Sequence, residues 1–245
     1  MTDDNTPTFH HLDHSQSQRI FWLLEELSIP YILQLHTRNP ITDPKAPLLA
    51  PPSLLATGPY GKAPLLIAGP KDGNRYIPET HAIATYLIRT FDHADAFGLR
   101  NGDWIRDEVL TSIGQTALRQ SITFMFTLDL HVIAKGPGPT GKRLGGPALR
   151  EVLAHLEREL KEGPAGGFFM GPNPGRADIM LEFPVALVRQ RKWLDLESEF
   201  PALNVWLDTC YARPAWKRSI EKGNGYDLTV FPQLEHLQLK QDGEL

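Results

Sequence analysis

The chain has 245 residues, a length that suits one large domain or two small ones, and its 41% hydrophobic and 22% charged residues are typical of a globular protein. Its net charge of −4 argues against a nucleic-acid-binding protein, whose surface is normally basic, and gives no polybasic signal for an anionic membrane. No apolar run approaches the roughly 20 residues that cross a bilayer, and the N-terminus lacks the basic start and apolar centre of a signal peptide, so we expect a cytoplasmic protein.

The cysteine and histidine content limits redox and metal chemistry. Cys210 is the single cysteine, which excludes an intramolecular disulfide, a Cys-x-x-Cys redox site and a multi-cysteine zinc site. We interpret it as a buried, inert thiol in a helix. Three histidines and an aspartate at positions 10, 11, 13 and 14 look like metal ligands in a row. Neighbouring residues of a strand point to opposite faces, however, and no second ligand cluster stands out, so we expect no metal.

The first elements of the chain are predicted to be strand, helix and strand. Thr8–Leu12 has strand character, and apolar residues recur at helical spacing between positions 20 and 27. That helix is expected to end near Ser28, because Pro30 disfavours a helical residue before it. Tyr31–Leu35 alternates like a strand. Such a unit normally forms a right-handed crossover between two parallel strands.

The next segment is predicted to be irregular and then to form a second pair of strands. Asn39–Tyr60 is rich in proline and is interpreted as a loop with at most one helical turn. Ala63–Ala68 and Arg75–Ile77 are candidate strands joined by a turn at Gly69–Asn74, and apolar residues at positions 82–87 indicate another helix. The order βαβ, irregular, ββα is that of a thioredoxin-type half-domain, so we expect an α/β thioredoxin-like domain over residues 1–92.

The remainder of the chain is predicted to be helical. We expect a linker at residues 93–102 and an all-α domain at residues 103–245. Helices are expected over Trp104–Ile133, around positions 149–160, over Ala177–Val188 and over Pro201–Ala212. Lys135–Pro147 is rich in glycine and proline and is predicted to be a loop. Its likeness to a nucleotide P-loop is weak, because Arg143 replaces the metal-binding hydroxyl residue and no strand precedes it.

Four stretches of the sequence carry a family pattern in order and at matching spacing. They are Leu12–Leu27, Gly61–Leu66 (a Gly-Lys-x-Pro-x-Leu segment), Glu79–Ile83, and Pro201–Trp206 with Ala212–Ala215. Together they resemble the cytosolic glutathione S-transferase family, and the opening stretch is most similar to a fungal branch with a serine-type site. The resemblance implies a glutathione-binding first domain, an all-helical second domain with a hydrophobic co-substrate site, and a homodimer.

Ser15 is the residue to which the resemblance assigns catalysis, with Ser17 as the fallback hydroxyl. A thiol with a pKa of about 8.5 is mostly protonated at pH 7, and lowering that pKa by ~2 units requires about 2.7 kcal/mol. A hydrogen bond to the thiolate, worth roughly 1.5–3 kcal/mol, supplies most of that. Ser15 stands at the mouth of the first helix, four residues before Arg19, the spacing of serine-type members. The alternative role for Ser15 is a helix N-cap.

The resemblance also places glutathione on two later motifs. Pro64 matches the family's cis-proline, which exposes the backbone of Ala63 to the cysteinyl part of glutathione, and the alternative is a trans proline that starts a strand. Glu79 is expected to hold the γ-glutamyl ammonium and Thr80 its carboxylate, at a helix start whose N–H groups are free for an anion. A simple helix start is the alternative there. His14 is expected to line the same site.

Two departures from the family pattern affect the site and the helical domain. The family often has His-Pro or Asn-Pro before the Gly-Lys segment, whereas this chain has Gly58 before the proline, so a side chain for the glycine end of glutathione is missing. Lys62, Lys45 and His36 are the candidates to replace it. The family's Ser/Thr-x-x-Asp capping box is reduced to Gly175–Asp178, in which the aspartate still can accept a backbone N–H.

The leading hypothesis is a transferase that activates glutathione as its thiolate for addition to a hydrophobic electrophile. Trp104, Phe124, Met125 and Phe126 are candidates for the wall of the co-substrate pocket, with Trp104 and Phe124 preferred and core packing as the alternative. Two other functions stay open. One is a glutathione-dependent alkene isomerase in a biosynthetic pathway, and the other is a non-catalytic binding or scaffold relative. Detoxification and secondary metabolism are both compatible with the transferase hypothesis.

Overall fold

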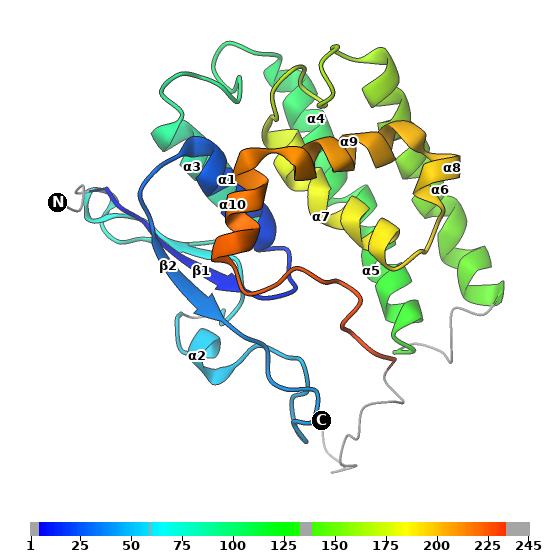
Figure 1. Cartoon of the computed structure of the whole chain (residues 1–245), viewed down its shortest axis with the longest axis horizontal. Helices are drawn as coiled ribbons and strands as arrows, with labels where there is room; N and C mark the ends of the chain where they lie inside the picture. The colour runs from blue at the N-terminus through cyan, green and yellow to red at the C-terminus, as the bar shows by residue number, and fades with distance from the viewer. Residues whose placement is uncertain (1–4, 59, 133–138, 234–245) are drawn as a thin grey trace.

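The N-terminal part of the chain folds around one mixed sheet, as Figure 1 shows. A computed structural model describes residues 5–58, 60–132 and 139–233. The strands β1 (Thr8–Leu12), β2 (Ile32–His36), β3 (Leu65–Ile67) and β4 (Tyr76–Pro78) lie in the order β2-β1-β3-β4. β1 is parallel to β2, and β3 is antiparallel to both β1 and β4. This topology confirms the predicted thioredoxin-like domain.

Helices of the first domain pack on the sheet and on each other. α1 (Gln18–Leu27) contacts α3 (Thr80–Phe91), and both contact strands of the sheet. The short helix α2 (Pro52–Leu55) is the helical turn expected within the proline-rich loop, and η1 (Pro70–Asp72) occupies the predicted turn between β3 and β4. α1 ends where predicted, because Ser28 adopts a left-handed conformation with φ of 51°.

The C-terminal part is all helical, as predicted. Its helices are α4 (Trp104–Gln115), α5 (Ala117–Asp129), α6 (Pro139–Glu162), α7 (Arg176–Gln190), α8 (Leu196–Glu199), α9 (Pro201–Ala212) and α10 (Pro214–Lys222). α7 is buried along most of its length and contacts α1, α3, α4, α5 and α9, which places it at the centre of the molecule (Figure 1). In the described part of the chain, no helix has the length and apolar character needed to cross a membrane.

The predicted loop at Lys135–Pro147 is wrong over the residues that the structure describes. Residues 133–138 lie outside the described ranges, but α6 begins at Pro139 and continues through Pro147. Packing explains the difference. A Cβ atom added to Gly145 would lie 2.7 Å from the sulfur of Met125, so the missing side chain lets α6 approach α5 closely. This contact outweighs the low helix propensity of the segment.

Two further boundaries differ from the prediction. The expected helix over Trp104–Ile133 is divided at Thr116, whose φ of −112° and ψ of −87° are not helical. α10 lies beyond the predicted helices, the last of which is Pro201–Ala212, and it begins at Pro214. Proline fits the first turn of a helix, where its missing N–H would have no partner. The extended conformation of Arg213 separates the two helices.

Asp178 near the start of α7 ties three segments of the helical domain together. Its Oδ2 accepts the backbone N–H of Gly175 at 2.8 Å, which confirms the predicted capping contact. Its Oδ1 accepts the backbone N–H of Phe169 at 3.0 Å and the indole N–H of Trp206 at 2.7 Å. The carboxylate is fully buried, and burial raises the pKa of Asp178 to about 6. One carboxylate therefore satisfies three buried donors.

Candidate functional site

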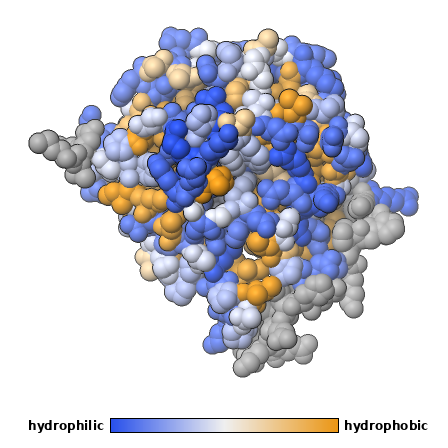
Figure 2. All heavy atoms as spheres, viewed as in Figure 1, coloured by the Kyte–Doolittle hydropathy of each residue, from blue (hydrophilic) through white to orange (hydrophobic). Residues whose placement is uncertain are grey.

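Two adjoining cavities lie where the thioredoxin-like domain meets the helical domain. The smaller one has a volume of about 410 Å³ and is lined mostly by the loop before β3, by β4 and by the start of α3. The larger one has a volume of about 600 Å³ and is lined by both domains. Gln16, Ala63 and Arg119 line both cavities. The face drawn in Figure 2 is hollowed near its centre, and hydrophobic residues lie at the rim of the hollow.

The turn between β1 and α1 holds a chain of hydrogen bonds that ends at the larger cavity. His11 Nδ1 lies 2.9 Å from Ser17 Oγ, and Ser17 Oγ lies 2.7 Å from Ser15 Oγ. The Ser15 hydroxyl donates to the carbonyl of Leu12 at 2.8 Å and accepts the backbone N–H of Ser17 at 3.2 Å. Ser15 lines the larger cavity, whereas Ser17 is fully buried and lines neither cavity. Ser15 is thus the end of this hydrogen-bond chain that lines the cavity, and Ser17 is an internal link.

The direction of this hydrogen-bond chain follows from His11. Burial lowers the pKa of His11 to about 3, so its ring is neutral at pH 7. His11 Nε2 is buried without a partner, and a buried N–H left unpaired is rarer in proteins than an unpaired acceptor. We therefore assign the ring proton to Nδ1, which donates to Ser17. Ser17 Oγ also accepts the N–H of Leu12 at 3.1 Å, and its own proton has two acceptors, the carbonyl of Leu12 at 3.0 Å and, at the shorter distance of 2.7 Å, Ser15 Oγ.

The pKa of His11 makes the folding stability dependent on pH. The folded-state value of about 3 lies below the unfolded value of 6.5, so the unfolded chain binds the proton first as the pH falls. The stability present above pH 6.5 is therefore lost toward pH 3. For His11 alone we expect a loss of about 2 kcal/mol between pH 8 and pH 5, measured by urea unfolding.

The variant His11→Gln isolates this contribution, since glutamine does not titrate. It should lose less stability than the wild-type chain between the two pH values, by about 2 kcal/mol. The exposed His93 provides the control, because His93→Gln should keep the wild-type pH dependence. Equal pH dependence in all three proteins would contradict the assignment of a buried neutral ring.

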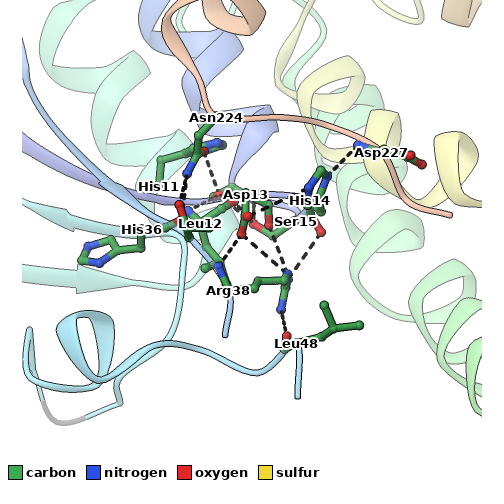
Figure 3. A network of polar contacts seen from close by, with 12 residues as sticks. His11, Leu12, Asp13, His14, Ser15, His36, Arg38, Leu48, Asn224 and Asp227 are labelled. Carbon is green, nitrogen blue, oxygen red and sulfur yellow. Dashed lines mark hydrogen bonds and ion pairs between the residues drawn. The ribbon is translucent and has the colours of Figure 1, made fainter. Parts of the chain in front are cut away.

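His14 faces the larger cavity and is held by the C-terminal segment. Its φ of 46° is unusual for a side-chain-bearing residue, and it lines the larger cavity and not the smaller one. His14 N–H donates to the carbonyl of Gly225 at 3.1 Å, and its Nδ1 accepts the N–H of Asp227 at 2.9 Å. Figure 3 shows the ring between the Ser15 turn and the segment that carries Asp227. A Cβ atom at Gly225 would lie 2.9 Å from the His14 ring, which explains the glycine.

The smaller cavity collects the residues expected to bind the peptide, apart from His14, which lines only the larger cavity. They are Lys62, Ala63, Pro64, Glu79 and Thr80. The bond between Ala63 and Pro64 is cis, as expected. Glu79 has a φ of 70°, a strained conformation that L residues rarely adopt and that occurs mostly at functional sites. Thr80 follows it as the first residue of α3 and is almost fully buried.

The three side chains considered for the glycine end of glutathione differ in position. Lys62 lines the smaller cavity, and Lys45 and His36 line neither cavity. His36 Nε2 is 3.0 Å from His10 Nδ1, and its Nδ1 is 3.0 Å from Ser53 Oγ on α2. Both ring nitrogens of His36 therefore already have partners, and β2, which carries His36, is separated by β1 from the strands next to the smaller cavity. Among the described residues, no group of three or more histidine, cysteine, aspartate or glutamate side chains is placed to hold a metal.

Trp104 and Phe124 do not line the larger cavity, contrary to the prediction. Trp104 is 62% exposed on α4, and Phe124 is 37% exposed on α5. The helical period explains the error. Ile122 and Phe126 are four residues apart on one face of α5, and both line the cavity. Phe124 lies between them in sequence and therefore on another face, where it approaches α6.

Sequence reasoning missed most of the larger cavity's wall, because its residues are scattered over α5, α7 and the C-terminal segment. The wall includes Ile122, Phe126, Phe183, Leu187, Leu228 and Phe231. Phe126 and Phe231 pack edge to face with ring centroids 5.6 Å apart, and the Arg38 guanidinium lies 4.9 Å from the centroid of Phe231. Among these residues the sequence indicates Phe126 alone, and the helical spacing between Phe126 and Ile122 is the signal that could have added Ile122.

Comparison with known proteins agrees with this geometry. The model of the glutathione S-transferase N-terminal domain matches residues 15–90, and that of the C-terminal domain matches residues 145–214. Glutathione S-transferase 3 of Schizosaccharomyces pombe is 28% identical over 242 residues, which cover 92% of this chain and 91% of the relative. Glutathione S-transferase 1 of Saccharomyces cerevisiae is 26% identical over 226 residues, which cover 87% of this chain and 93% of the relative.

A solved structure is similar to this chain as well. A glutathione S-transferase from Actinobacillus pleuropneumoniae superimposes with a TM-score of 0.74 and 25% identity, covering 92% of this chain and 97% of that one. The two family models together match more than half of the sequence, in the order of the two domains of the fold. The chain therefore belongs to the glutathione S-transferase family.

Proposed function

We propose that the protein is a serine-type glutathione transferase, in which Ser15 stabilises the thiolate of glutathione for attack on an electrophile held in the larger cavity. The observation that carries this proposal is the position of two residues. Ser15 and Ala63 both line the larger cavity, and Ala63 also lines the smaller one. A thiol at this junction has the peptide-binding residues on one side and an apolar cavity on the other.

The smaller cavity supplies the groups that a tripeptide with two carboxylates and one ammonium needs. Glu79 offers a carboxylate for the γ-glutamyl ammonium, and Thr80 offers a hydroxyl and a helix start for the γ-glutamyl carboxylate. Lys62 offers a cation for the glycine carboxylate. The backbone of Ala63 is placed to pair with the cysteinyl residue. Each role is a proposal that rests on the family assignment and on these positions.

The chemistry of the proposal needs few protein groups. The thiol proton leaves to solvent, and the Ser15 hydroxyl turns from the carbonyl of Leu12 to donate its hydrogen bond to the sulfur anion. The sulfur then forms a bond to the electrophilic carbon, and either a leaving group departs with its electron pair or, for an activated alkene, the neighbouring carbon takes a proton from solvent. The hydrogen bond from Ser17 to Ser15 strengthens this donor, because hydrogen bonds in a chain polarise one another. An alkene isomerase would use the same thiolate, adding it and then releasing it.

Calorimetric titration with reduced glutathione and with S-methylglutathione tests the proposed site. Binding of both, weakened by Lys62→Ala and by Thr80→Ala, is the expected result. A protein that binds neither at millimolar concentration is a non-catalytic relative. Mass spectrometry of the products then separates the two enzyme hypotheses, since a conjugate contains the glutathionyl group and an isomer has the mass of its substrate.

We also propose a homodimer that forms through α4. Ile105 and Val109 lie one helical turn apart and are 59% and 51% exposed, next to the exposed Trp104. Sedimentation should show a dimer, and Ile105→Glu should weaken its association by at least about tenfold, because it buries an unpaired charge. Val205→Glu on α9 is the matched control, since Val205 is 63% exposed. A wild-type species of 27.5 kDa would contradict the dimer.

A further inference from the structure

The larger cavity combines an apolar wall with positively charged side chains. Arg19, Arg38 and Arg119 line it. Among the described residues of its lining, there is no aspartate and no glutamate. Apolar side chains of α5, α7 and the C-terminal segment make up most of the remaining surface. A cavity of this kind favours a ligand with an apolar body and a negative charge.

Two of the three arginines are held in place by uncharged acceptors. Arg19 donates to the carbonyl of Met180 at 2.5 Å and to the side-chain oxygen of Gln16 at 2.9 Å. Arg38 donates to the carbonyl of Leu48 at 2.9 Å, and the nearest carboxylate oxygen to its side chain, on Asp13, is 3.9 Å away. These contacts fix the two side chains. The carboxylates that act on them electrostatically, Glu182 on Arg19 and Asp13 on Arg38, do not line the cavity.

Arg119 differs from the other two because its guanidinium is free. It lies in the first turn of α5, is exposed, and lines both cavities. Within residues 5–58, 60–132 and 139–233 its guanidinium has no hydrogen-bond or ion-pair partner. A free guanidinium presents a planar set of donors that matches a carboxylate, and pairing with an anion gives strong, charge-assisted hydrogen bonds.

We propose that the larger cavity selects electrophiles that carry a carboxylate on an apolar, ring-containing body, and that Arg119 binds this carboxylate. The proposal rests on the proposed function, since it names the class of the second substrate at that site. Phe126, Phe183 and Leu187 contact the ring, and Arg19 and Arg38 add to the positive potential of the cavity. Arg119 lies at the junction of the two cavities, so the carboxylate is held close to the reacting sulfur.

A matched pair of substrates tests the selection. A chloronitrobenzoate and the corresponding chloronitrobenzamide react in the same way, because the glutathione sulfur forms a bond to the ring carbon and chloride leaves. In Arg119→Gln, kcat/KM for the benzoate should fall by at least about tenfold, the loss expected for one hydrogen-bonded charge pair. For the benzamide it should change by less than about twofold. Arg119→Lys should restore part of the benzoate activity.

The exposed Arg75, which lines neither cavity, gives the control variant Arg75→Gln, and this should leave both rates unchanged. An equal loss for both compounds in Arg119→Gln would assign Arg119 to glutathione and overturn the proposal. Unchanged rates for both compounds would also overturn it.

A binding measurement separates this proposal from the proposed function. Nitrobenzoate and nitrobenzamide, which lack the leaving group, are titrated into the wild-type protein in the presence of S-methylglutathione. Tighter binding of nitrobenzoate that is lost in Arg119→Gln supports the anion site even if no conjugate forms, and the transferase function alone would then be rejected. Equal binding of the two compounds overturns the anion site, whether or not the protein is a transferase.

Discussion

Replacing Ser15 by alanine is expected to lower kcat/KM at pH 7 by about 10- to 100-fold, while the Kd for glutathione changes by less than about threefold. The variant loses one hydrogen bond to a charged group, worth roughly 1.5–3 kcal/mol, and the thiolate carries that charge only after ionisation. Ser15 contributes little to holding the peptide, because the expected peptide-binding residues other than His14 line the smaller cavity and Ser15 lines the larger one. The comparison requires steady-state kinetics and calorimetry on the same proteins.

The pH dependence of the Ser15→Ala defect distinguishes lost thiolate stabilisation from a damaged fold. Above the pKa of the free thiol, about 8.5, glutathione is ionised without help, so the defect should shrink as the pH rises toward 9. A structural defect would persist at every pH. Ser121→Ala on α5 is the control, because its exposed hydroxyl bonds only to its own helix at the carbonyl of Ala117. Turnover that is unchanged in Ser15→Ala would remove Ser15 from the mechanism.

Replacing Asp178 by alanine is expected to lower the free energy of unfolding by about 3–5 kcal/mol. The change leaves the N–H groups of Gly175, Phe169 and Trp206 without their acceptor, and each unsatisfied buried donor costs roughly 1–3 kcal/mol. It also opens a small void in a fully buried place. Urea unfolding followed by circular dichroism gives the free energy directly.

Asp208 supplies the matched control for this experiment. It is also an aspartate of the helical domain, but its side chain is 63% exposed and pairs with Arg189 at 2.6 Å. Exposed pairs contribute little to stability, so Asp208→Ala should cost less than about 1 kcal/mol. Similar losses in the two variants would show that the hydrogen bonds of Asp178 do not stabilise the helical domain as the geometry implies.

The sequence predicted those elements whose signals are local. Thr8–Leu12 and Pro201–Ala212 coincide with β1 and α9, because the first carries strand-forming residues before a polar turn and the second begins and ends at a proline. α6 was predicted only from its second half. The close approach of Gly145 to Met125 is a tertiary contact, and the sequence contains no sign of it.

The candidate site likewise consists of residues with local sequence signals and residues that only tertiary contacts bring together. Ala63, Pro64, Glu79 and Thr80 belong to short motifs, and all of them line the smaller cavity. The residues that complete the site come from distant parts of the chain. Asp227, for example, bonds to His14 from 213 residues further along. Neither periodicity nor motif spacing indicates a contact between residues so far apart in the sequence. Most wall residues of the larger cavity could therefore be identified only from the structure.

The central claim is that Ser15 lowers the pKa of glutathione bound at the junction of the two cavities. The most direct measurement is the pKa of the bound thiol, obtained from the ultraviolet absorbance of its thiolate as a function of pH in the wild-type protein and in Ser15→Ala. We expect a value about 2 units below that of free glutathione in the wild-type protein, and a rise of about 1–2 units in the variant. A bound thiol with the same pKa in both proteins would contradict the mechanism.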